Sequence, residues 1–223
     1  MTARPRTRLS PDHATALVQR GWDRLTWRYR PRGRARDALG HGTEEYRAWV
    51  GLLGSRLPAG ARVLELGSGT GEPTARLLAR RYHALGVDLS PVMVRRARAR
   101  VRNARFVQGD MTQVRFEPAS FDAVVSLYAM IHVPRRRQRA LVGRIARWLR
   151  PGGYFLAIVG HDAYEGVEAR WLGGLALMYW SHPAAATFRR WLVESGFTIE
   201  EQRFVPEGRS GHELFLARRS PRG

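Results

Sequence analysis

Apolar and polar positions follow two different repeats along this chain. Up to about residue 60 the apolar positions recur at helical spacing, which predicts an amphipathic helix over residues 12–29 and a second helix over residues 43–57. Thr43 caps the second helix and Pro58 ends it. The stretch PRGRARDALGHG between the two helices is typical of a flexible connection. We expect residues 1–58 to form a helical cap before the main core.

From Ala61 onward, short apolar runs alternate with helical patterns. The predicted strands cover residues 62–66, 83–88, 104–108, 121–127, 153–159, 197–204 and 212–217. The predicted helices among them cover residues 73–81, 91–102, 135–149 and 184–195. Such alternation predicts an α/β, Rossmann-like fold with a seven-stranded, mostly parallel sheet and helices on both faces. The last two strands are joined by the turn PEGRSG without a helix, so they should form an antiparallel hairpin.

Composition limits the class of protein. The 223 residues are enough for one well-filled core, which we expect over residues 59–223, and 44% of them are hydrophobic. The absence of cysteine excludes disulfides, thiolate metal sites and cysteine nucleophiles, and we expect no metal. The longest apolar run, residues 121–133, is broken by Asp122 and His132 and reads as a buried strand rather than a membrane span. Residues 1–10 lead into no apolar signal segment, so we expect a cytoplasmic protein.

The formal charge of +19 raises the question of a nucleic-acid partner. All 38 basic residues are arginine, a pattern that fits a GC-rich coding bias at least as well as selection for a polyanion. The arginines are scattered over most of the chain, whereas a nucleic-acid surface gathers them on one face with aromatics for stacking. The denser runs, residues 28–36 and 135–139, are interpreted as solvated surface, and a nucleic-acid partner is not expected.

A glycine-rich stretch follows the first strand of the expected core. In RVLELGSGTGEPT, Gly67, Gly69 and Gly71 lie where the strand ends and a helix begins. Glycines permit a tight turn and allow a ligand to touch the main chain, and a helix terminus offers unpaired N–H groups. In a doubly wound sheet this is the crevice where ligands bind.

Three further features point into the same crevice. The second strand ends in GVDLS, which places Asp88 about twenty residues beyond the glycines, where it can accept both hydroxyls of a ribose. The third strand is followed by GDM, whose Asp110 can accept from an exocyclic amine while the Met111 N–H meets a ring nitrogen. The fourth strand, FDAVVSLYAMIHVP, should line the opposite wall. Together they describe a pocket for a nucleoside that carries a short charged group.

With these motifs the chain resembles the class I S-adenosylmethionine-dependent methyltransferases. The resemblance runs from Trp22 to the carboxyl end and rests on VLELGSGTG, GVDLS, GDM, FDAVVSLYAMIHV and RWLRPGGYFLA, in that order. The glycine spacing is GxGxG and not the GxGxxG of dinucleotide enzymes. Another nucleotide-binding α/β protein is the alternative.

The resemblance implies S-adenosylmethionine as cofactor. It places Glu65 at the pocket floor, where the alternative is a strand glutamate turned to solvent, and Tyr29 as a residue that closes over the cofactor, where the alternative is a core tyrosine. The implied cofactor contacts are Tyr29, Glu65, Gly67, Ser68, Gly69, Gly71, Asp88, Leu89, Met93, Asp110, Met111, Leu127, Tyr128 and His132.

Methyl transfer from a sulfonium needs alignment and exclusion of water, and a base only if the acceptor carries a proton that water cannot easily take. The histidines considered for this role are His132, His182 and His212, with Tyr128 and Tyr179 as orienting hydroxyls. We expect the catalytic residues to be His132, His212 and Tyr128. His132 could instead hold its loop or contact the cofactor.

Residues 161–183 lie where relatives insert a substrate-binding segment. Its aromatic residues could form a wall for a ring-bearing or greasy small molecule, and the candidate substrate contacts are Trp171, Tyr179, Trp180, His182 and His212. The NPPY or DPPY motif of base-flipping relatives is absent. We expect a small-molecule methyltransferase of natural-product metabolism that is a monomer or homodimer without membrane association. The alternatives are an RNA or protein methyltransferase and a non-catalytic cofactor-binding regulator or partner subunit.

Overall fold

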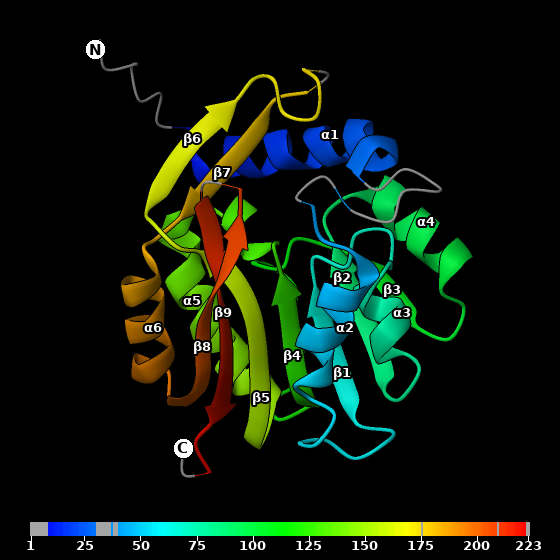
Figure 1. The fold of residues 1–223 in the computed structure, drawn as a ribbon, viewed down its shortest axis with the longest axis vertical. Coiled ribbons are helices and arrows are strands. Elements are labelled where there is room, and N and C mark those ends of the chain that lie inside the picture. Colours follow the sequence, from blue (N-terminus) through cyan, green and yellow to red (C-terminus); the bar gives the residue numbers. More distant parts are fainter. Residues whose placement is uncertain (1–8, 30–36, 38–39, 175, 209, 222–223) are drawn as a thin grey trace.

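The computed structural model describes residues 9–29, 37, 40–174, 176–208 and 210–221 (Figure 1). The expected flexible connection over residues 31–42 and the arginine run over 28–36 lie largely outside the described residues. Within the described part, no helix combines the length and apolar character needed to span a bilayer.

A seven-stranded sheet forms the centre of the molecule, in the order β3-β2-β1-β4-β5-β9-β8. The first five of these strands are parallel, and β9 and β8 add to them as an antiparallel hairpin, which confirms the predicted fold. The strands are β1 (Arg62–Leu66), β2 (His83–Asp88), β3 (Arg105–Gln108), β4 (Phe121–Leu127), β5 (Leu149–Gly160), β8 (Phe197–Glu207) and β9 (Ser210–Arg219).

Helices cover both faces of this sheet. They are α2 (Thr43–Gly51), α3 (Thr74–Leu78), α4 (Pro91–Arg100), α5 (Arg135–Trp148) and α6 (Ala185–Glu194), with the 3-10 helix η1 (Met130–His132) after β4. The second predicted helix ends at Gly51 and not at residue 57, and turns follow it, beginning with the hydrogen bond from Gly54 N to Gly51 O at 2.8 Å. Glycine disfavours helix continuation because it loses the most backbone freedom.

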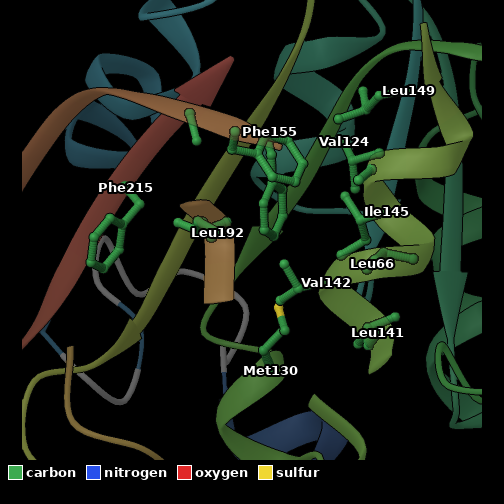
Figure 2. Packing of buried hydrophobic residues seen from close by; sticks show 14 of the residues in the cluster. Leu66, Val124, Met130, Leu141, Val142, Ile145, Leu149, Phe155, Leu192 and Phe215 are labelled. Carbon is green, nitrogen blue, oxygen red and sulfur yellow. The ribbon is translucent and has the colours of Figure 1, made fainter. Parts of the chain in front are cut away.

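Two apolar clusters hold the layers together, one on each side of the sheet. The first joins alternate sheet residues such as Leu66 and Phe155 to α5 and α6, through Ile145 and Leu192 (Figure 2). The second joins the opposite sheet positions to α2 and α3, as at Trp49. Alternation of side chains across each strand accounts for the two faces.

A separate cap lies over the carboxyl ends of the parallel strands (Figure 1). It consists of α1 (Pro11–Tyr29) and an antiparallel hairpin of β6 (Tyr164–Glu168) and β7 (Met178–His182). The hairpin was not predicted. The expected cap segment of residues 1–58 therefore divides, because α1 packs on this hairpin while α2 buries its aromatic face in the main core.

Buried polar contacts attach the cap to the core. The side-chain amide of Gln138 on α5 lies within 3.0 Å of the carbonyl oxygens of Met130, Val133 and Ser181. The hydroxyl of Ser90 donates to the carboxylate of Asp23 on α1 at 2.5 Å. Both cap segments are thus tied to elements that surround the ends of the strands.

Candidate functional site

A cavity opens at the carboxyl ends of β1, β2 and β4, beneath the cap. Its empty volume, including the open mouth, is about 990 Å³. Its walls combine the glycine loop, the ends of β2 and β4, the loop after β3, and α1. The lining residues include Trp22, Tyr29, Tyr46, Glu65, Gly67, Ser68, Gly69, Thr70, Thr74, Asp88, Leu89, Met93, Asp110, Met111, Leu127, Tyr128 and His132.

The glycine loop is shaped by backbone that other residues adopt only with strain. Gly67 has φ +80°, and a Cβ there would lie 2.1 Å from the Cβ of Ala129. Gly69 has φ +53° with open space beside it. Gly71, also implied as a cofactor contact, does not line the cavity; it packs toward Val101 and Phe106 instead. Its φ of +80° and this close packing both favour glycine at the position.

Asp88 ties the end of β2 to the glycine loop. One carboxylate oxygen accepts from the backbone N–H of Gly69 at 2.8 Å, and the other accepts from that of Ser90 at 2.9 Å. Burial raises the pKa of Asp88 to about 6, although these two N–H groups act to lower it. Each carboxylate oxygen retains a further lone pair for a hydroxyl donor.

Glu65 lies at the floor of the cavity and is only 4% exposed. Burial and the neighbouring Asp88 raise its pKa well above the ordinary value, while a hydrogen bond with Thr74 opposes the shift. Its Oε2 and the hydroxyl of Ser68 have no partner among the described residues. Buried polar atoms without partners are costly, so a ligand that hydrogen-bonds them would be favoured here.

The loop after β3 forms the third wall. Asp110 Oδ1 accepts from the backbone N–H of Thr112 at 2.7 Å, and Arg144 donates to the carbonyl oxygen of Met111 at 2.7 Å. These contacts fix the loop and leave the second carboxylate oxygen of Asp110 with Arg137 at 4.0 Å as its ion-pair partner.

His132 lines the cavity as a neutral ring. Its Nδ1 donates to the carbonyl oxygen of Tyr179 at 2.9 Å. Burial lowers its pKa to about 4, against the effect of that carbonyl. The ring lies 5.5 Å from Trp22 and 4.6 Å from Trp180. An uncharged ring at this position does not repel a cationic ligand.

The candidate substrate residues of the cap do not line this cavity. Trp171 and Trp180 pack with Trp22 and His132 in the cap core. The Tyr179 hydroxyl donates to Glu165 within the hairpin at 2.8 Å. The ring of His182 lies against Gly160, where a Cβ would be 1.8 Å from its Nδ1. These residues build the cap, and they reach the cavity wall through their contacts with Trp22, Tyr29 and His132.

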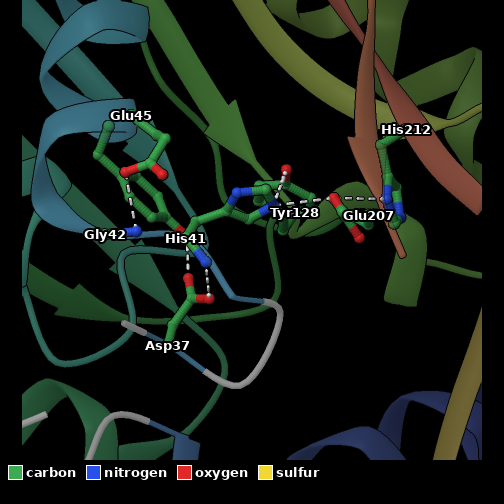
Figure 3. Close-up of polar contacts among 8 residues, drawn as sticks. Asp37, His41, Gly42, Glu45, Tyr128, Glu207 and His212 are labelled. Carbon is green, nitrogen blue, oxygen red and sulfur yellow. Dashed lines mark hydrogen bonds and ion pairs between the residues drawn. The ribbon is translucent and has the colours of Figure 1, made fainter. Parts of the chain in front are cut away.

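His212 belongs to a buried polar cluster next to the cavity wall, which we call the Glu207 cluster: His41, Tyr128, Glu207 and His212 (Figure 3). Glu207 Oε1 lies 3.0 Å from His41 Nε2 and 3.0 Å from His212 Nδ1, and the Tyr128 hydroxyl lies 2.9 Å from His41 Nε2. Sequence reasoning missed His41 and Glu207. No local pattern marks them, since 166 positions separate the two residues.

Comparison with known proteins gives a consistent result. Residues 63–153 match the family model of the methyltransferase domain. An uncharacterized methyltransferase of Bacillus licheniformis is 37% identical over 112 residues, which are 49% of this chain and 53% of the relative. A demethylmenaquinone methyltransferase of Clavibacter sepedonicus is 29% identical over 177 residues, which are 67% of this chain and 71% of the relative. The chain spans about half the length of the first of these.

Among solved structures, the magnesium protoporphyrin IX methyltransferase of Synechocystis PCC 6803, crystallised with bound SAH, superposes with a TM-score of 0.71. The two chains are 19% identical, and the match covers 93% of this chain and 100% of the other. At this identity the likeness concerns the fold alone.

Proposed function

Because the chain carries the methyltransferase domain of the class I S-adenosylmethionine-dependent methyltransferases, we propose that it transfers the cofactor's methyl group to a small-molecule acceptor. The observation that carries this proposal is the cavity at the ends of β1 and β2. There the Asp88 carboxylate and two unpartnered polar atoms, Glu65 Oε2 and the Ser68 hydroxyl, lie beside a loop whose glycines admit close contact.

The residues of the cavity fit S-adenosylmethionine. Asp88 would accept from the ribose hydroxyls, and Asp110 with the N–H of Met111 would read the adenine edge between Leu89 and Met93. Glu65, Gly67, Ser68 and Gly69 would hold the methionyl end. Leu127, Tyr128 and Tyr29 would close the remaining walls. When bound, the cofactor supplies an electrophilic methyl group on a sulfonium.

The task of the protein is then to position the acceptor and to exclude water. In the cap, α1 covers the cavity with Trp22 and Tyr29, and the neutral ring of His132 on η1 lies beside them, so this wall is aromatic. Among the described residues that line the cavity there is no arginine to repel a positive charge on the ligand. This arrangement supports in-line displacement in an apolar chamber.

The cap also favours a compact acceptor. The helix α1 lies over the cavity with Trp22 and Tyr29, and β7 packs behind this helix. A cavity covered by aromatic side chains suits a ring-bearing molecule better than a polymer. The relatives are described by acceptors as different as demethylmenaquinone and magnesium protoporphyrin IX. We therefore propose a class of acceptor, a small molecule of the kind found in natural-product metabolism, and name no particular compound.

Titration with S-adenosylhomocysteine in a calorimeter tests the site. We expect Asp88→Asn to weaken binding by about 10- to 100-fold, since a ribose hydroxyl loses a charged acceptor worth roughly 1.5–3 kcal/mol. Asp122→Asn is the matched control. Asp122 also accepts a backbone N–H, from Arg62 at 2.6 Å, but at the opposite end of the sheet. If the parent protein, Asp88→Asn and Asp122→Asn all bound S-adenosylhomocysteine with equal affinity, the cavity would not be the cofactor site.

A further inference from the structure

The segment that follows β2 touches the cap at two consecutive residues. The hydroxyl of Ser90 donates to the carboxylate of Asp23 on α1 at 2.5 Å. The side chain of Leu89 packs against the apolar cluster that joins α1 to the β6–β7 hairpin, and it also lines the cavity. Both residues directly follow Asp88, the carboxylate proposed above for the ribose. The cap therefore meets the core beside the expected position of the nucleoside.

Ser90 is the junction of three hydrogen bonds. Its backbone N–H donates to Asp88 Oδ1 at 2.9 Å. Its side-chain oxygen accepts from the backbone N–H of Met93 at 3.1 Å and so caps the start of α4. A hydroxyl has one hydrogen to donate, and here it goes to Asp23. Because Ser90 is fully buried, losing this acceptor would leave its hydroxyl without a partner, which is costly.

The helix that carries Asp23 forms one wall of the cavity. It lies over the carboxyl ends of the parallel strands (Figure 1), and its residues Thr15, Val18, Trp22 and Tyr29 line the cavity. These four residues lie on both sides of Asp23 along α1. A cofactor bound in the cavity would therefore contact α1. Its affinity would depend on the fraction of molecules in which α1 is in place.

The two carboxylates on either side of Ser90 also interact through their charges. Burial is the main cause of the raised pKa of Asp88, and the negative charge of Asp23 adds to the rise. The charge of Asp23 thus disfavours the ionised form of Asp88, which is the form that accepts from ribose hydroxyls. The favourable contribution of Asp23 must therefore come from its hydrogen bond with Ser90.

We infer that Asp23 is a positioning residue for the cofactor, because its hydrogen bond with Ser90 holds α1 against the end of β2, where the ribose would bind. This inference rests on the proposed function. With α1 held in this way, the ribose acceptor and the α1 wall are both in place before the cofactor arrives. If α1 is released, affinity falls in proportion to the fraction of molecules that keep it in place. By reciprocity, the bound cofactor favours the attached helix by the same factor.

Titration of Asp23 variants with S-adenosylhomocysteine tests the hydrogen bond. Asp23→Ala removes the acceptor, and we expect about tenfold weaker binding, the effect of losing one hydrogen bond to a charged group. Asp23→Asn keeps an oxygen that can accept from Ser90, so its affinity should stay within about 3-fold of the parent's. Asp12→Ala is the matched control on the same helix. Asp12 pairs with Arg137 at 2.6 Å, but its side chain is 87% exposed, so its loss should also change affinity by less than about 3-fold.

A double-mutant cycle shows whether Asp23 acts through Ser90. Ser90→Ala removes the donor, so adding Asp23→Ala to it should weaken binding no further. Hydrogen exchange gives a second measurement. The amides of α1 should exchange faster in ligand-free Asp23→Ala than in the ligand-free parent protein, and S-adenosylhomocysteine should slow them again. Exchange in the central strand β4 should be the same in both proteins.

The outcomes separate this inference from the proposed function. An Asp23→Ala protein with the parent's affinity would overturn the inference, and so would losses that multiply in the double variant or an Asp23→Asn protein as weak as Asp23→Ala. Thermal unfolding shows whether each variant folds, and the two Asp23 variants carry the test if Ser90→Ala does not fold. If Asp88→Asn weakens binding and Asp23→Ala does not, this inference fails and the proposed function stands. If the parent protein does not bind S-adenosylhomocysteine, the proposed function itself fails.

Discussion

At the scale of single residues, backbone conformation and burial decide what each position of the site can do. Gly69 and Asp88 illustrate the two cases. Gly69 holds a left-handed turn beside open space, and Asp88 is a carboxyl whose ordinary pKa is changed by its surroundings. Both effects lead to measurable consequences.

Gly69→Ala should separate backbone strain from ligand contact. An alanine with φ +53° costs about 1–2 kcal/mol of stability, and its methyl group projects into the space expected for the methionyl arm. We expect about tenfold weaker S-adenosylhomocysteine binding, or 1.4 kcal/mol. Gly196→Ala carries a similar penalty, at φ +85° with nothing within 4 Å, but lies far from the cavity. If the two variants bound the ligand equally well, Gly69 would not be a contact.

The raised pKa of Asp88 predicts that ligand affinity depends on pH. Hydroxyls donate to the ionised carboxylate, so S-adenosylhomocysteine affinity should fall as the pH drops through about 6, approaching tenfold per unit below it. Calorimetry between about pH 5 and 8 measures this, and Asp88→Asn should flatten the curve. A curve of the parent protein that is flat over this range would contradict the prediction.

The free protein should respond to Asp88 in the opposite sense. The folded pKa of about 6 lies above the ordinary 3.8, so the folded state binds more protons between these values. The contribution of Asp88 to stability is therefore present below about pH 4 and is lost as the pH rises through about 6. This loss of stability at higher pH arises mainly from burial, because burial disfavours the charged form of the Asp88 carboxyl.

At the scale of elements, the cap depends on close approach between α1 and β7. Gly21 on α1 makes this approach possible, since a Cβ there would lie 2.9 Å from the carbonyl oxygen of Leu177 and 2.8 Å from the Cε of Met178. The methionine end can move, but the carbonyl belongs to the backbone of the hairpin. A substitution at Gly21 must therefore displace one element from the other.

Gly21→Ala and Gly143→Ala should change stability in opposite directions. Helix propensity alone favours both by up to about 1 kcal/mol. Gly143 on α5 has open space around it, so we expect that gain there. At Gly21 the clash should outweigh it and cost about 1–3 kcal/mol. Denaturant unfolding measures whether each variant is more or less stable than the parent protein. Hydrogen exchange should show faster opening of α1 and β7 in Gly21→Ala and not in Gly143→Ala. Equal gains in both variants would mean that the cap tolerates the added methyl.

The sequence predicts the core elements well and the cap poorly, for physical reasons. Strands such as β1 and β4 are short, mainly apolar runs bounded by turn residues, so the local sequence specifies them. The strands β6 and β7 have mixed polar patterns, and they exist because their pairing covers α1. That pairing is tertiary, and no local repeat records it.

The site divides in the same way. The glycine loop, Asp88 and Asp110 follow strand ends and could be located from spacing. The Glu207 cluster could not, because sheet topology alone brings β8 beside the loop that holds His41. Gly71 is a different case: it belongs to the glycine motif in the sequence, but in the structure it packs against Val101 and Phe106 and does not line the cavity.

At the scale of the whole molecule, charge dominates. A formal charge of +19 on 223 residues means that self-repulsion destabilises the compact state, and salt screens it. An exposed ion pair such as that between Arg47 and Glu44 contributes little to stability, so little is lost when salt screens it.

Stability should therefore rise with ionic strength. We expect the Tm to increase when sodium chloride is raised from about 0.05 M to 0.5 M, by roughly 2–4 °C for each kcal/mol of repulsion removed. Scanning calorimetry measures it, with the zwitterion betaine at equal osmolality as a control for effects other than screening. A Tm that fell with salt would show that attractive pairs outweigh repulsion.

The helix α1 forms the roof of the cavity, and its position depends on β7, a distant stretch of the sequence that packs behind it without lining the cavity. Acceptor preference is consequently not a property that one stretch of sequence can carry. Grafting residues 161–183 from a relative onto this chain would set a foreign hairpin on a helix shaped for another partner, with Gly21 as the point of misfit. A chimera that exchanges the helix and the hairpin together would transfer the chamber intact.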